Sequence, residues 1–174
     1  STTVKRGAKY EVRQPWKCLP AEPFMPDNRP VVHRRFQNLF NKFEKDPQLF
    51  KDYRAAIDKY IQTGCAEKVP ADQIITEKGR SNYLPHHPVS HERKSMRVVF
   101  DTSLRTNGKS LSTETLSGPD VLNSLLGVLL RFRLRPVAVA CDFSAFYHSV
   151  QIPECDRDFQ RFFWFDGETL DSPV

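Results

Sequence analysis

The chain has 174 residues, a formal net charge of +5 at pH 7 and 39% hydrophobic residues, which predicts one domain, or a compact part of a larger one, with its own core. The four cysteines show no metal-binding spacing and no disulfide density, and no apolar run is long enough to span a membrane. We therefore expect no membrane partner and an intracellular protein with reduced thiols, whether nuclear or cytoplasmic. The basic charge suits a polyanionic partner, and it equally suits a solvated basic surface.

The N-terminal part predicts an extended lead-in followed by two antiparallel helices. Residues 1–30 are basic and rich in proline, and 10–16 alternate like a short strand. A helix is expected to start at 27–30, where a polar cap precedes a proline, and a second one at Asp46 and Pro47, ending before Gly64. Apolar residues recur at helical spacing in both segments and predict a shared core, namely Val32, Phe36, Leu39, Phe40 and Phe43, then Phe50, Tyr53, Ile57, Tyr60 and Ile61.

The next apolar segments, 83–89 and 96–101, predict a β-hairpin with a basic tip. His91, Arg93 and Lys94 lie at this tip, and Arg97 lies just inside the following strand. Such cations can hold phosphates through charge-assisted hydrogen bonds, although hairpin tips are also often charged merely because they are solvated. The adjacent histidines 86 and 87 point to opposite faces of a strand, so a structural role is favoured over a shared metal.

A polar loop at 102–117 contains the turn signal Asn107-Gly108 and is expected to be functional because of its length. A third helix is predicted from 118–120 onward. Its broad apolar face consists of leucines, namely Leu122, Leu125, Leu126, Leu129 and Leu130.

The segment from Val137 to Cys141 is a run of small or β-branched apolar residues that predicts a strand buried on both faces. It ends at Asp142, which is either an ordinary capping residue or a carboxylate that pairs with a bound cation. Tyr147 follows at a spacing that allows ring and carboxylate to face one cleft. A helix start at 154–158 and an aromatic strand at 159–165 come next, and Asp166-Gly167 is a hairpin signal. This order of elements predicts an α+β fold.

Read together, these segments resemble reverse transcriptases, most closely those of BEL/Pao-type LTR retrotransposons. Residues 142–150 look like the first catalytic motif of the polymerase palm, 151–162 like the segment that follows it, and 97–101 like the upstream fingers strand. No one motif is very specific, but the ordered set covers nearly the whole chain. The remaining family-like pieces are 10–13, 83–87, 106–108, 129–134 and 156–158.

The resemblance implies the fold and the site. The fold would be an incomplete right hand, with reverse-transcriptase-like fingers at 31–135 (helical pair, basic hairpin and helix) and the first part of the palm at 136–174 (strand and hairpin). Asp142 would ligate Mg²⁺, with the backbone carbonyl of Phe143 as a further ligand, in two-metal phosphoryl transfer. Tyr147 would lie under the sugar and favour deoxynucleotides, and Arg97 would contact the triphosphate of the dNTP.

The same resemblance assigns weaker roles at the edge of this site. Lys94 would reach the γ-phosphate. Arg93, Asp101 and Asn107 would lie near the RNA or DNA template-primer.

One difference from reverse transcriptases limits the activity that we expect of this chain. The sequence contains no Asp-Asp pair, whereas the second acidic motif of a reverse transcriptase requires one. One carboxylate cannot hold two Mg²⁺ ions, so this chain alone is predicted to be inactive and to bind no stable metal. It is then a piece of an active polymerase or a domesticated relic. The alternatives are a protein-interaction module, which would expose apolar surface at 137–150 and 159–165 and could form a homodimer, and a non-catalytic nucleic-acid-binding module.

Overall fold

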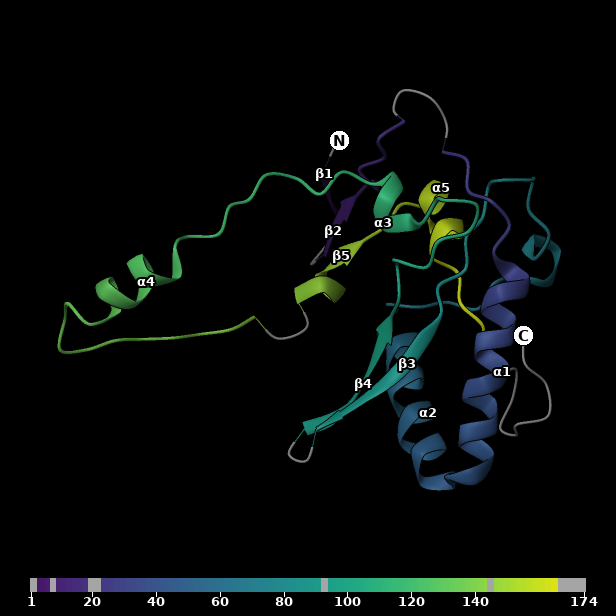
Figure 1. Cartoon of the computed structure of the whole chain (residues 1–174), viewed down its shortest axis with the longest axis horizontal. Coiled ribbons are helices and arrows are strands. Elements are labelled where there is room, and N and C mark those ends of the chain that lie inside the picture. The colour runs from purple at the N-terminus through teal and green to yellow at the C-terminus, as the bar shows by residue number, and fades with distance from the viewer. Residues whose placement is uncertain (1–2, 7–8, 19–22, 92–93, 144–145, 166–174) are drawn as a thin grey trace.

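The computed structural model describes residues 3–6, 9–18, 23–91, 94–143 and 146–165. Helices and two small sheets make a mixed α+β fold (Figure 1), as the sequence predicts. One sheet holds β1 (Thr3–Arg6), β2 (Lys9–Val12) and β5 (Val150–Gln151), and the other holds β3 (His86–His91) and β4 (Lys94–Phe100). No helix in these ranges is long and apolar enough to cross a membrane. The predicted hairpin at Asp166 and Gly167 lies outside the described residues.

Two helices form the largest layer, and both begin where the sequence places them. In α1 (Arg29–Lys45) a proline lies in the first turn, and in α2 (Pro47–Gln62) the Asp46 carboxylate accepts a hydrogen bond from the Leu49 backbone at 2.9 Å. This bond satisfies one of the free N–H groups at the start of the helix. Most residues of the predicted apolar faces are buried, while Phe40, Phe50 and Tyr60 are partly buried and Ile61 is exposed. The buried residues of this first core are Val32, Phe36, Leu39, Phe43, Tyr53, Ile57, Tyr83, Val98, Phe163 and Phe165.

The predicted hairpin is present, and its two faces differ. Pairing sets His86 opposite Phe100 and Pro88 opposite Val98 on the inner face, which packs toward the helices. His87 pairs with Val99 and Val89 pairs with Arg97 on the outer face. The two histidines therefore point to opposite sides, as predicted: His86 is buried and His87 is exposed.

His86 joins three segments of the core. Its Nε2 lies 2.8 Å from the Phe163 carbonyl, which can only accept, so Nε2 carries the hydrogen and Nδ1 accepts from the Tyr53 hydroxyl. Burial lowers the pKa of His86 to about 4, and the nearby His87 acts in the same direction, against the bond to Phe163. Burial likewise raises the pKa of the Tyr53 hydroxyl. His86 is therefore a neutral core residue, which supports the predicted structural role.

A second core forms between the N-terminal and C-terminal segments. Its buried residues are Trp16, Met25, Leu84, Leu111 and Phe159. The Asp156 carboxylate, in the short helix α5 (Glu154–Arg157), is almost fully buried beside them. It accepts hydrogen bonds from Trp16 Nε1 at 3.0 Å and from the Gln14 backbone at 3.1 Å. Together with the parallel pairing of β2 and β5, these bonds tie the first residues of the chain to the last described ones.

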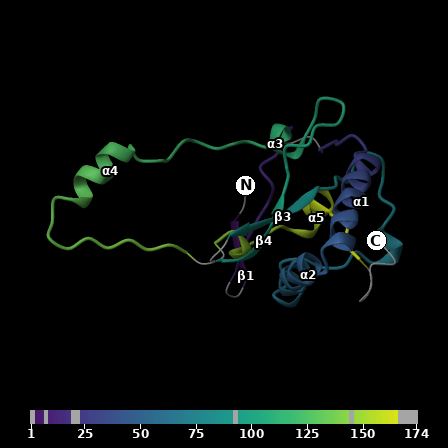
Figure 2. The same cartoon turned by 60° about the horizontal axis from the view of Figure 1, so that its bottom comes forward.

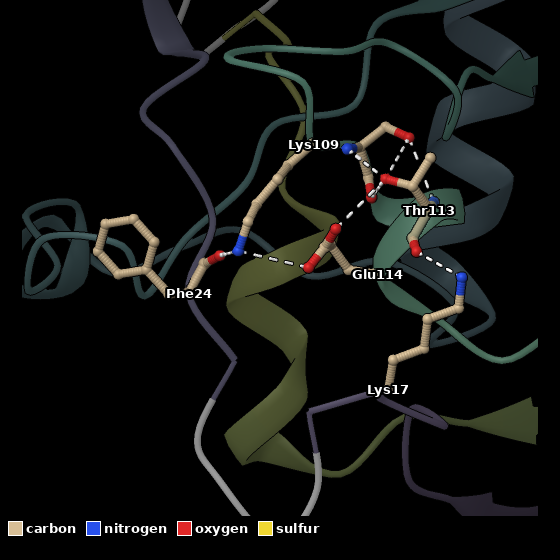
Figure 3. A network of polar contacts seen from close by, with 6 residues as sticks. Lys17, Phe24, Lys109, Thr113 and Glu114 are labelled. Carbon is tan, nitrogen blue, oxygen red and sulfur yellow. Dashed lines mark hydrogen bonds and ion pairs between the residues drawn. The ribbon is translucent and has the colours of Figure 1, made fainter.

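The loop after the hairpin is more ordered than its sequence predicts. Asn107 and Gly108 both have positive φ, 48° and 81°, and Thr106 and Lys109 close the turn as the Asn-Gly signal indicates. Helix α3 (Leu111–Glu114) follows, capped by Ser110. Figure 3 shows how this region is held: Lys109 Nζ lies 3.4 Å from the Glu114 carboxylate and donates to the Phe24 carbonyl at 3.3 Å, and Lys17 donates to Thr113.

Three predictions about the later segments are wrong. The third helix, α4 (Leu125–Phe132), begins five residues or more after the predicted start at 118–120, and its leucines are exposed. Val137–Cys141 is neither a strand nor buried. It is an exposed segment that leads from α4 back to the rest of the fold, and α4 lies away from the other elements (Figures 1 and 2). An apolar run becomes a buried strand only if neighbouring strands pair with it, and no described strand does so.

The aromatic segment 159–165 contains the 3₁₀ turn η3 (Asp158–Gln160) and an extended stretch bridged to Tyr83, not a regular strand. Phe163 and Phe165 are buried and Phe162 and Trp164 are partly buried, because they pack into the core formed with α1, α2 and the hairpin. Phe159 is buried in the second core. This burial contradicts the exposure that the interaction-module alternative requires for 159–165. Exposure of 137–143 and of 146–150 agrees with that alternative.

Gly79 occupies a position that other residues would strain. Its φ is 83°, and an added Cβ would lie 2.2 Å from the Phe24 ring. We expect Gly79→Ala to lower the free energy of unfolding by about 2 kcal/mol, because left-handed backbone alone costs roughly 1–2 kcal/mol with a side chain. Gly64→Ala is the control, since Gly64 has a φ of 65° with nothing within 4 Å of an added Cβ. If urea unfolding shows the same loss of unfolding free energy in Gly79→Ala and Gly64→Ala, a clash with the Phe24 ring does not contribute.

Candidate functional site

The residues predicted for the palm motif lie on one exposed stretch of chain. Asp142 and Phe143 end the return from α4, and Tyr147 lies in the 3₁₀ turn η2 (Phe146–Ser149). The Phe146 ring contacts both the Phe143 ring, at a centroid distance of 6.1 Å, and the Tyr147 ring, at 5.8 Å. The Tyr147 side chain is 87% exposed. The three rings form an aromatic cluster that is open to solvent and follows the Asp142 carboxylate along the chain.

Tyr60 connects this stretch to the hairpin. Its ring contacts the His148 ring at a centroid distance of 4.9 Å, edge to face. The Val98 backbone N–H donates to its hydroxyl, and the Arg97 charge lies close enough to favour its ionised form. Burial nevertheless raises the pKa of the Tyr60 hydroxyl, since it outweighs both influences. Tyr60 thus contacts His148, the neighbour of Tyr147, from a helix that packs against β4.

The cations near the hairpin tip are only partly placed. Lys94 begins β4, but its side chain lies outside the described residues, as does the whole of Arg93. Arg97 is exposed on the outer face of β4. Of the predicted phosphate-binding cations at 93, 94 and 97, Arg97 is therefore the one whose side chain the structure describes.

Asp101 and Asn107 have local partners that explain them structurally. The Asp101 carboxylate accepts from the Ser103 hydroxyl at 2.6 Å and backbone at 2.9 Å, and it pairs with Arg35 at 3.2 Å. The Ser103 hydroxyl, the Ser103 backbone and Arg35 lower the pKa of the Asp101 carboxyl against a smaller opposing effect of burial. Asn107 supplies the first positive φ of its turn. Among the described residues, neither Asp101 nor Asn107 forms a hydrogen bond or ion pair with the palm motif.

The donors present do not fit a magnesium site. Two-metal chemistry requires several oxygen ligands that converge on the ions. In the part of the chain that the structure describes, no three His, Cys, Asp or Glu side chains come close enough to share an ion. What the described residues do offer is an exposed guanidinium at Arg97 and exposed aromatic rings at Phe143, Phe146 and Tyr147.

Sequence reasoning missed several residues at or near this site. Tyr60 was predicted only as a core residue, and no local pattern links it to Arg97 or His148. Arg35, Asn38 and Lys42 lie at i, i+3 and i+7 on α1, a spacing that is visible in the sequence. This polar spacing is less conspicuous than the apolar spacing of the same helix.

Comparisons with protein-family models, with curated proteins and with solved structures find no match to this chain.

Proposed function

We propose that this chain is the fingers and first palm motif of an RNA-directed DNA polymerase of the LTR-retrotransposon type, incomplete for catalysis by itself. The ordered set of family-like motifs supports this, as does the α+β arrangement of a helical pair against a basic hairpin. The observation that carries the proposal is that α2 packs against β4, the strand that holds Arg97, while Tyr60 of α2 contacts the His148 ring of η2. The fingers-like hairpin and the motif around Tyr147, which are far apart in sequence, thus lie against the same helix.

In this proposal the exposed surface at Arg97 and η2 faces a nucleotide at the end of a primer. Arg97 binds phosphate oxygens, which its planar guanidinium can contact with two parallel hydrogen bonds. The exposed Tyr147 ring lies against the sugar. Magnesium, when held in a completed palm, supplies charge neutralisation of the phosphates, and Asp142 is the residue of this chain that offers it a carboxylate.

The proposal predicts that the chain binds nucleic acid through Arg97. We expect Arg97→Gln to weaken binding of a fluorescent RNA–DNA template-primer about tenfold, since a charge-assisted hydrogen bond contributes roughly 1.5–3 kcal/mol. The slope of log affinity against log salt should also decrease in magnitude by about 0.9. Fluorescence anisotropy at several salt concentrations measures both quantities.

The matched control is Lys51→Gln, which removes the same charge from an exposed position of α2. Lys51 precedes Tyr60 by nine residues on that helix, about 13 Å along its axis, so binding should be unchanged. If both variants lost the same affinity for the template-primer, the cause would be the change in net charge, and a specific role for Arg97 would be contradicted. Absence of salt-dependent binding by the unchanged chain would contradict the proposed function.

A further inference from the structure

A solvent-open hollow lies between α1 and β3, the first strand of the hairpin. Its volume is about 220 Å³, far above the roughly 10–15 Å³ that one water requires. Leu39, Pro85 and His86 form its apolar part. Its polar lining consists of Arg35, Asn38 and Lys42 from α1, His87 from β3, and Asp101 just after β4.

The donors around this hollow outnumber the acceptors. Both Asp101 oxygens are already used, one by Ser103 and the other by Arg35. The charges of Arg35 and Asp101 offset each other, so Lys42 leaves the hollow positive. Within the described ranges neither Lys42 nor His87 has an ion-pair partner. Helical spacing sets the three α1 side chains in one row, so that their N–H groups can converge on one oxyanion.

The hollow and Arg97 are reached along one face. His87 and Arg97 both lie on the outer face of the hairpin, opposite Val99 and Val89 respectively. His87 precedes Val89 by two residues, so the two positions are about 7 Å apart along the strands. This is about two nucleotide steps, at roughly 3.4 Å per nucleotide of a duplex strand. No Phe, Tyr or Trp side chain lines the hollow, and most of its polar lining consists of N–H donors, which suit a phosphate.

We propose that this hollow binds a phosphate group, and that the phosphate belongs to the backbone of the nucleic-acid strand that passes over Arg97. This inference rests on the proposed function for the identity of the strand. The phosphate chemistry itself rests on the hollow alone.

The test uses two probes, a fluorescent oligothymidylate and inorganic phosphate. We expect Lys42→Gln to weaken oligothymidylate binding several-fold and to reduce the magnitude of the salt slope by about 0.7, the value per phosphate contact of a single strand. In NMR titrations, inorganic phosphate should shift the Asn38 side-chain amide and the His87 backbone amide of the unchanged chain. These shifts should be lost in Lys42→Gln.

Lys45→Gln is the matched control, because Lys45 lies in the same last turn of α1 but does not line the hollow. Equal effects of Lys42→Gln and Lys45→Gln, or no effect of either, overturn the inference. If Lys42→Gln has no effect but Arg97→Gln weakens binding, the inference fails and the proposed function stands. If phosphate shifts Asn38 but no oligonucleotide binds, the hollow is a site for free phosphate, and the strand and the proposed function are both wrong.

Discussion

Asp156→Ala is expected to lower the free energy of unfolding by about 3 kcal/mol or more. The substitution removes the acceptor of Trp16 Nε1 and of the Gln14 backbone while leaving both donors in place. A buried donor without a partner costs roughly 1–3 kcal/mol, and Trp16 and Asp156 are each only 1% exposed. The ion pair with Arg13 adds little, because the Arg13 side chain is 45% exposed. Urea unfolding followed by tryptophan fluorescence measures the loss.

Two further variants sharpen this prediction. Asp156→Asn retains one carbonyl oxygen for Trp16 and should lose less stability than Asp156→Ala. Glu154→Ala removes an exposed carboxylate from the same short helix and should change stability by no more than about 0.5 kcal/mol. If Asp156→Ala matched Glu154→Ala, the buried carboxylate would not be what holds the two ends of the chain together.

Acidification should destabilise the protein through His86. Its pKa is 6.5 in the unfolded chain and about 4 in the folded one, so between these values the unfolded chain binds a proton that the folded chain does not. Stability is therefore fully present above pH 6.5 and falls as the pH decreases toward about 4. The full difference corresponds to about 3 kcal/mol. The pKa of the Asp101 carboxyl is lowered from its ordinary value of 3.8, so the stability that it contributes is lost mainly at lower pH, outside this window.

His86→Gln tests the assignment, because glutamine can accept and donate hydrogen bonds but does not titrate. This variant should be less stable at neutral pH, and its stability should depend less on pH between 6.5 and about 4. His87→Gln changes the exposed neighbour and should retain most of the pH dependence, because burial is the main cause of the lowered pKa of His86 and His87 is a smaller one. Denaturant midpoints measured across the window distinguish the two. If the stability of His86→Gln still falls with decreasing pH as in the unchanged chain, another group causes the acid sensitivity.

Local features of the chain were readable from the sequence. The cap at Asp46, the proline after it and the apolar spacing of both helices depend on residues within a few positions of one another, so they act wherever the chain folds. The hairpin at 86–100 and the Asn-Gly turn are equally local. Among the predicted site residues, Arg97 was placed correctly on a strand face for the same reason.

The long-range features were decided by tertiary structure alone. The apolar run Val137–Cys141 predicted a buried strand, and the structure leaves this segment exposed. The interaction-module alternative expected 159–165 to be exposed, and the structure buries Phe159, Phe163 and Phe165. Burial depends on which distant segments cover a residue, and the space between α1, α2 and the hairpin accepts the later aromatic segment. The sequence by itself thus determined the first two helices, the hairpin and the candidate residues. Only the fold decided that Tyr60 contacts His148 and that Asp156 and His86 are buried, because those contacts join residues far apart in the chain.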